Sequence, residues 1–110
     1  MVNKKNLYKT KEYWIKEIQN EIYSQVVNYM ASYDLNQNEL AEKWGVSKRY
    51  VSEILNGNCN FSLKKLVELS LALEKAPLIE YVEMNRYYEF MEEMNNLDKQ
   101  INMLSSEKRT

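Results

Sequence analysis

Two short helical patterns separated by a single glycine dominate the stretch LNQNELAEKWGVSKRYVSEILNG, residues 35–57. Apolar residues recur at helical spacing over 37–44 and again over 48–55. Helices of this length are marginal in isolation, so both must be stabilised by packing against longer helices. Gly45 is expected to end the first of them in a left-handed C-cap. The inward-facing residues of the pair would be Leu40, Ala41, Trp44, Val51, Ile54 and Leu55.

The turn Gly45-Val46-Ser47 would set the angle between the two helices. Ser47 is an N-cap candidate for the second helix, and Val46 would fill the space between the pair. The start of the second helix then projects from the domain and carries four outward polar side chains: Lys48, Arg49, Ser52 and Glu53. A helix presented in this way fits the major groove of DNA, which is about 12 Å wide.

The rest of the chain also shows helical patterns, and two glycines and one proline leave little turn material for a sheet. A long first helix is expected from the N-cap Thr10 to about Ser32, and a fourth helix from Leu63 to about Lys75, capped by Ser62. The first would use Trp14, Ile15, Ile18, Ile22, Val26, Tyr29 and Met30 as its apolar face. The fourth would bury Leu66, Val67, Leu69, Ser70 and Leu73. Pro77 either ends the fourth helix or opens a fifth.

The last third of the chain predicts one long helix from Leu78 to about Ser105. Apolar residues follow a heptad seam of two to three repeats along it: Tyr87, Phe90, Met94, Leu97, Ile101 and Leu104. The seam either packs on its own domain or pairs with the same helix of a second copy. Three or more full heptads would be needed to decide between these from the sequence.

The residue inventory excludes several kinds of chemistry. The chain has no histidine and one cysteine, Cys59, so structural zinc sites, an intramolecular disulfide and Ser-His or Cys-His catalysis are not expected. There is no glycine-rich phosphate loop and no clustered carboxylate pocket, so we predict neither an enzyme nor a cofactor. No apolar run approaches the roughly 20 residues that span a bilayer, and no apolar signal core follows the N-terminal lysines. A cytoplasmic protein with no membrane association is expected.

Charge is distributed unevenly along the chain, although the net charge is only −1. Residues 1–16 carry five lysines and one glutamate, and residues 34–65 carry five basic and four acidic residues. Residues 66–110 carry nine acidic and five basic residues. A surface that faces DNA should therefore come from the first and third of these segments. The lysines at 4, 5, 9, 11 and 16 would form either an arm that grips phosphates or a solubilising tail.

Residues 35–57 resemble the helix-turn-helix of the lambda-repressor-like (Cro/CI, XRE) family of regulators. The elements that match are Gln37, the Leu40-Ala41 pair, the Gly45-Val46-Ser47 turn, Val51-Ser52 and the closing Asn56-Gly57. The segment FSLKKLVELSLALE is similar to the fourth helix of that family, and the resemblance covers about residues 22–76. Two features depart from the family pattern: the first helix is extended at its start behind a basic segment, and Asn60-Phe61 replaces a more usual proline. The resemblance implies an all-α, compact bundle of about five helices that binds operator DNA, here with an extended C-terminal helix.

The resemblance also implies roles for individual residues. Gln37 should bind a phosphate, which agrees with the free N–H groups at a helix N-terminus. Ser47, Lys48, Arg49 and Ser52 should face the groove, where Arg49 could read guanine bidentately. Glu53 could orient Arg49 or accept from cytosine. The residues expected along the neighbouring backbone are Asn56, Asn58, Asn60, Ser62 and Lys64.

Simpler interpretations remain open for several of these residues. Lys48 and Arg49 could be a solvated pair, and Gln37 could be an ordinary helix-start residue. Tyr50 either packs over the helix edge or reaches a phosphate. Cys59 is most simply a bystander thiol, because no base lies near it in sequence.

Two functional hypotheses follow. The first is a sequence-specific regulator, typically a repressor, that binds a palindromic operator as a homodimer. Residues 1–77 would form the DNA-binding domain, with the helix-turn-helix at 37–56, and residues 78–110 would form a dimerisation or partner-binding helix. The second is the antitoxin of a toxin–antitoxin pair, which would hold a toxin protein through the acidic C-terminal helix and repress its own promoter.

Overall fold

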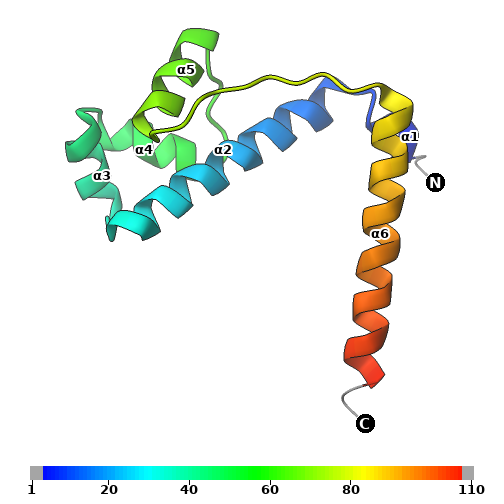
Figure 1. Cartoon of the computed structure of the whole chain (residues 1–110). Coiled ribbons are helices and arrows are strands. Elements are labelled where there is room, and N and C mark those ends of the chain that lie inside the picture. The colour runs from blue at the N-terminus through cyan, green and yellow to red at the C-terminus, as the bar shows by residue number, and fades with distance from the viewer. Residues whose placement is uncertain (1–3, 108–110) are drawn as a thin grey trace. The chain divides into compact units, whose positions relative to one another are not determined.

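The computed structural model describes residues 4–107, and within this range every regular element is an α-helix and no strand occurs. This confirms the all-α prediction, with a helix-turn-helix and a long C-terminal helix (Figure 1). The chain divides into two compact units after Leu78. None of the described helices is long and apolar enough to cross a membrane.

The first unit begins with a short helix, α1 (Lys4–Leu7), and a long one, α2 (Lys11–Tyr33). Thr10 is the N-cap of α2, as predicted, because its hydroxyl accepts from the Tyr13 N–H. The helical turn before it was not expected from the sequence. Tyr8, just after that turn, is buried, and its carbonyl accepts from the Trp14 indole N–H. The lysine-rich start of the chain is thus packed on α2 at Tyr8.

The pair α3 (Gln37–Trp44) and α4 (Lys48–Leu55) has the predicted bounds. Asn36 and Glu39 form a capping box at the start of α3, and Gly45 ends that helix in the left-handed region at φ 66°. A side chain is strained in that backbone conformation, which is why glycine stands there. Ser47 caps α4 through the Tyr50 N–H.

The fourth predicted helix, α5 (Leu63–Ala72), is shorter than expected. Leu73 is its C-cap and Glu74 adopts φ 63°, so the chain leaves the helix before Lys75. Val67 is exposed rather than buried, because the face of α5 that meets the core is the one carrying Leu66, Leu69 and Leu73.

The core of the first unit lies where α2, α3, α4 and α5 meet. Its fully buried side chains are Val26, Leu40, Val51 and Ile54. Ile15 and Ile18 of α2 were expected on the apolar face and are instead about half exposed. The helix is longer than the bundle it supports, so its N-terminal half extends past the core. Trp44 packs against the core at its edge, with its ring centroid 5.3 Å from that of Tyr29.

A polar cluster joins the end of α2 to α3 and to the segment after α5. The Tyr33 hydroxyl donates to Glu74 Oε2 at 2.6 Å, and Lys43 Nζ lies 3.4 Å from the Tyr33 ring centroid. This hydrogen bond raises the pKa of Tyr33 above its ordinary value. The cluster places the C-terminal end of α2 in contact with α3 and with the segment after α5.

The second unit consists mainly of α6 (Met84–Glu107). The helix begins at Met84, six residues later than the predicted start at Leu78. Residues 75–83, which include Pro77, are not helical. Five apolar side chains of the heptad seam are about half exposed: Phe90, Met94, Leu97, Ile101 and Leu104.

Candidate nucleic-acid interface

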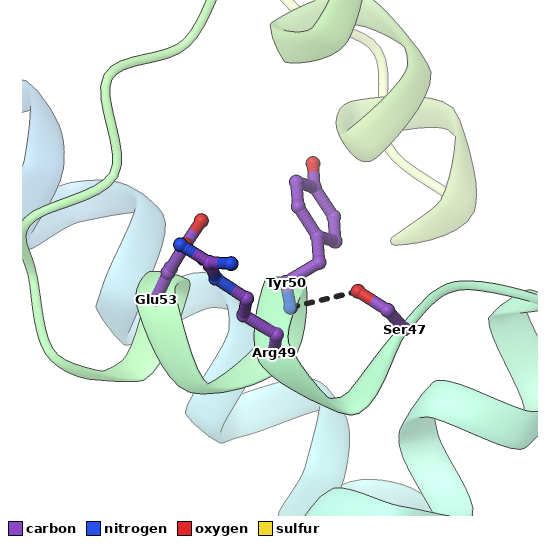
Figure 2. Close-up of polar contacts among 4 residues, drawn as sticks. All are labelled: Ser47, Arg49, Tyr50 and Glu53. Atoms are coloured by element: carbon purple, nitrogen blue, oxygen red, sulfur yellow. Dashed lines mark hydrogen bonds and ion pairs between the residues drawn. The ribbon is translucent and has the colours of Figure 1, made fainter.

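The N-terminal half of α4 presents its polar side chains to solvent, as predicted from the sequence. Lys48 is exposed, and the side chain of Arg49 has 88% of its surface accessible. The Ser47 hydroxyl accepts from the Tyr50 N–H at 3.0 Å and so completes the helix start (Figure 2). Ser52 is partly buried on the same helix. This end of α4 is therefore open to a partner outside the chain.

Arg49 and Glu53 form an ion pair one helical turn apart. Arg49 Nε donates to Glu53 Oε1 at 3.1 Å, and the two side chains lie against each other in Figure 2. The contact occupies the Nε–H and leaves the Nη groups of the guanidinium for another acceptor. Because both side chains are exposed, the pair adds little stability. Its consequence is orientation of the guanidinium.

Tyr50 turns toward α5, away from Arg49 and Glu53 (Figure 2). It packs against the core, and Lys65 Nζ lies 5.8 Å from its ring centroid. Burial raises the pKa of the Tyr50 phenol. Of the two interpretations of Tyr50, the packing one is observed, and contact of its hydroxyl with a phosphate stays a prediction.

The start of α3 offers a second set of donors. Asn36 Oδ1 accepts from the Glu39 N–H at 2.8 Å, and Glu39 Oε1 accepts from the Asn36 N–H at 3.0 Å. This capping box leaves the N–H groups of Gln37 and Asn38 at the N-terminal end of the helix without intrahelical acceptors. The Gln37 side chain is exposed beside them. Such an arrangement suits an anion such as a phosphate.

The segment after α4 carries the remaining predicted contact residues. Asn56, Asn58, Asn60 and Lys64 are exposed, and Gly57 adopts φ 72°. Ser62 Oγ accepts from the Lys65 N–H at 3.2 Å as the N-cap of α5. All of these lie between the C-terminal end of α4 and the first turn of α5.

Two residues of α2 lie beside this segment: Lys16, one of the lysines for which both a phosphate-gripping arm and a solubilising tail were considered, and Gln19, which no sequence pattern indicated. Lys16 Nζ donates to the Gly57 carbonyl at 3.5 Å, and Gln19 Nε2 donates to the Cys59 carbonyl at 3.0 Å. The partners are 41 and 40 residues apart, so no local pattern could have revealed them.

Cys59 offers little chemistry of its own. Its thiol is partly buried, and burial, followed by the charge of Glu53, raises its pKa and so disfavours the reactive thiolate. Within the described part of the chain, no group of three His, Cys, Asp or Glu side chains could hold a metal.

Comparison with protein families agrees with this geometry. A family model described as Helix-turn-helix matches residues 28–78. Residues 28–78 form a helix-turn-helix DNA-binding domain of the Cro/CI (XRE) type. Searches of curated proteins and of solved structures found no match to the chain.

The helix-turn-helix domain includes only the C-terminal end of α2. The match includes α3, α4 and α5 but begins at Asn28, near the end of α2. Residues 11–27 of α2 therefore lie outside the matched range, and so do Lys16 and Gln19. Domains of this type are typical of regulators that are not enzymes.

Proposed function

We propose that the protein is a sequence-specific transcriptional regulator, acting as a repressor, that binds a palindromic operator as a homodimer. The observation that carries the proposal is the exposed, oriented guanidinium of Arg49 at the start of α4 within a helix-turn-helix domain. In such domains this helix enters the major groove with its N-terminal residues toward the base edges.

Base discrimination would come from the start of α4. With Nε held by Glu53, the two Nη groups of Arg49 can donate to O6 and N7 of a guanine. Lys48 would read a second base or hold a phosphate, and Ser47 and Ser52 would contact the same groove. Glu53 acts by fixing Arg49, and its own negative charge disfavours misplaced phosphates.

Affinity would come mainly from phosphate contacts on either side of α4. Gln37 and the N-terminal end of α3 would bind one phosphate. The exposed side chains after α4 would follow the neighbouring backbone: Asn56, Asn58, Asn60, Ser62 and Lys64, with Tyr50 at the edge of this surface.

Dimerisation would use the seam of α6, formed by Tyr87, Phe90, Met94, Leu97, Ile101 and Leu104. Exposure of this apolar stripe supports pairing with an identical stripe, because burial would remove it from water. A dimer places two recognition helices about 34 Å apart, one turn of DNA.

The direct test is selection of preferred duplexes from a random pool, combined with the solution mass of the free protein. A palindromic consensus with half-sites one helical turn apart, together with a dimeric mass, is the expected result. Recovery of sequences no different from the input pool would contradict the proposal.

The antitoxin function is the second candidate, and the same exposed stripe favours it. Glu89, Glu92 and Glu93 are exposed on α6, and Glu93 borders the apolar seam at the heptad spacing, so the helix combines acidic and apolar surface that also suits a basic partner protein. Co-purification of a second small protein in stoichiometric amount, with the seam protected on binding, would favour this candidate over homodimerisation.

A further inference from the structure

We propose that Lys16 is a further DNA-phosphate-binding residue, and that α2 lengthens the DNA-contacting surface along the segment that follows the recognition helix. The inference rests on the proposed function, because it requires α4 to lie in the major groove. It concerns a part of the chain outside the matched helix-turn-helix range.

The first argument is position. Lys16 Nζ lies 3.5 Å from the Gly57 carbonyl, immediately after α4, and 3.6 Å from the place where a Cβ on Gly57 would stand. Figure 1 shows the segment between α4 and α5 passing beside α2. The positive charge of Lys16, which lies on α2, is therefore next to the C-terminal end of α4.

The second argument is that a second hydrogen bond, from Gln19, holds α2 against the same segment. Three residues along α2, Gln19 Nε2 donates to the Cys59 carbonyl at 3.0 Å, so one face of α2 holds two carbonyls of the same segment. Gln19 is partly buried, whereas Lys16 is exposed. Gln19 is therefore a positioning residue, and Lys16 is the one that can meet a ligand.

The third argument is the donor capacity of the ammonium. A lysine has three N–H donors, and the single contact to the Gly57 carbonyl is long. Within the described residues no carboxylate forms an ion pair with Lys16. The charge is thus available to an external anion.

The fourth argument is the set of polar side chains in the segment that Lys16 contacts. Asn56, Asn58 and Asn60 are exposed in the same segment, and amide side chains commonly contact the sugar-phosphate backbone. When α4 lies in the groove, this segment faces the strand that borders it. A phosphate of that strand would then be a negatively charged group close to the Lys16 ammonium.

A simpler role is that Lys16 only neutralises the carbonyls at the C-terminal end of α4. That role would affect folding stability and leave DNA binding unchanged at temperatures where the domain is folded. The experiment must therefore measure both properties on the same variants.

The test compares Lys16→Gln with wild type in the full chain, using the selected operator duplex and a scrambled duplex between 50 and 200 mM salt. A homodimer loses two phosphate contacts, one per copy, so the slope of log affinity against log salt should become less steep by about 1.8, and binding at 0.1 M salt should weaken about 25- to 100-fold. Both duplexes should lose the same factor. Lys16→Arg, which keeps the charge, should restore the slope.

Lys99→Gln is the matched control, because it removes the same charge from an exposed position on α6, off the apolar seam. It should leave the slope unchanged. An unchanged slope in Lys16→Gln overturns the inference, whatever happens to the thermal midpoint. Equal losses in both variants also overturn it, since they report net charge and not a local contact. Absence of salt-dependent binding in wild type would overturn the proposed function and this inference together.

Discussion

The bundle of α2 to α5 and the C-terminal helix α6 use their apolar residues in opposite ways. In the bundle, Val26, Leu40, Val51 and Ile54 are completely or almost completely removed from water by residues of the same chain. In α6, Phe90, Leu97 and Ile101 each keep about half of their surface exposed. The innermost side chains of the bundle are thus covered within one copy, whereas the apolar stripe of α6 is about half exposed along its length.

The difference separates two kinds of sequence signal. In the bundle, helix limits are set by caps: Thr10, Asn36, Ser47 and Ser62 each accept from a backbone N–H three residues later. In α6 the signal is a repeat of apolar positions, which describes a surface and says nothing of its occupant. The limits of each helix can thus be inferred from local sequence, whereas the partner of the α6 surface cannot.

The largest effect is expected from Leu40→Ala. Leu40 is completely buried, so its truncation should lower the free energy of unfolding by about 2–5 kcal/mol. Urea titrations followed by tryptophan fluorescence report on the bundle, because both tryptophans, Trp14 and Trp44, lie in it. Leu97→Ala is the comparison, and it should leave this transition within about 0.5 kcal/mol. Equal losses in the two variants would mean that α6 is part of the bundle core.

The next largest effect concerns assembly. Leu97→Glu places a charge in the α6 seam and should convert the dimer to a monomer in sedimentation experiments. Operator affinity should then fall about a hundredfold, because the second half-site no longer benefits from tethering. Met103→Glu adds the same charge at an exposed position off the seam and should change neither property. A wild-type protein that is monomeric when bound to DNA would refute this assignment of α6.

The third prediction concerns recognition within the bundle. Arg49→Ala should cost about 1–3 kcal/mol of operator binding and relax base preference at one position. Arg49→Lys keeps the charge but loses the planar fork, so scrambled DNA should still bind as in wild type while discrimination is lost. If Arg49→Ala kept the wild-type ratio of operator to scrambled binding, Arg49 would not be a base-reading residue.

These regions also show how far the sequence could be interpreted. The bounds of α3 and α4 were predicted because each end has a local cause, such as Gly45 in the left-handed region or the cap at Ser47. The exposure of Arg49 followed from helical spacing alone. Signals within four residues were sufficient for all of this.

The errors arose where the deciding contact was distant or absent. The sequence predicts a helix from Leu78, but residues 78–83 are not helical and α6 begins at Met84. Ile15 and Ile18 were expected to be buried, but α2 extends beyond the helices that would cover them. The contact of Lys16 with Gly57 spans 41 residues, so only the assembled bundle reveals it.

A smaller effect should follow from Gly45→Ala in the turn between α3 and α4. No atom lies within 4 Å of the added Cβ, so the cost is the left-handed backbone alone, about 1–2 kcal/mol in the unfolding free energy. Gly45→Asn is the matched variant and should cost less, because asparagine adopts this conformation more readily. Urea midpoints of the two variants give the comparison. A neutral Gly45→Ala would mean that the turn relaxes without strain.

The smallest effect concerns pH and the hydroxyl of Tyr33. The hydrogen bond to Glu74 raises the pKa of Tyr33, and only the protonated phenol can donate it. Its contribution to stability should therefore be fully present below pH of about 10, the ordinary tyrosine value, and should disappear as pH rises through the raised value.

Lys43 lies over the same ring and remains in contact in Tyr33→Phe, so that variant removes only the hydroxyl. Urea midpoints of Tyr33→Phe and wild type between pH 7 and 11 should differ by a constant amount at first and converge above pH 10. Tyr23→Phe, at an exposed position on the same helix, should show no such convergence. A constant difference for Tyr33→Phe up to pH 11 would mean that deprotonation of Tyr33 does not weaken the folded state in this range, which would contradict the role given to its hydrogen bond with Glu74.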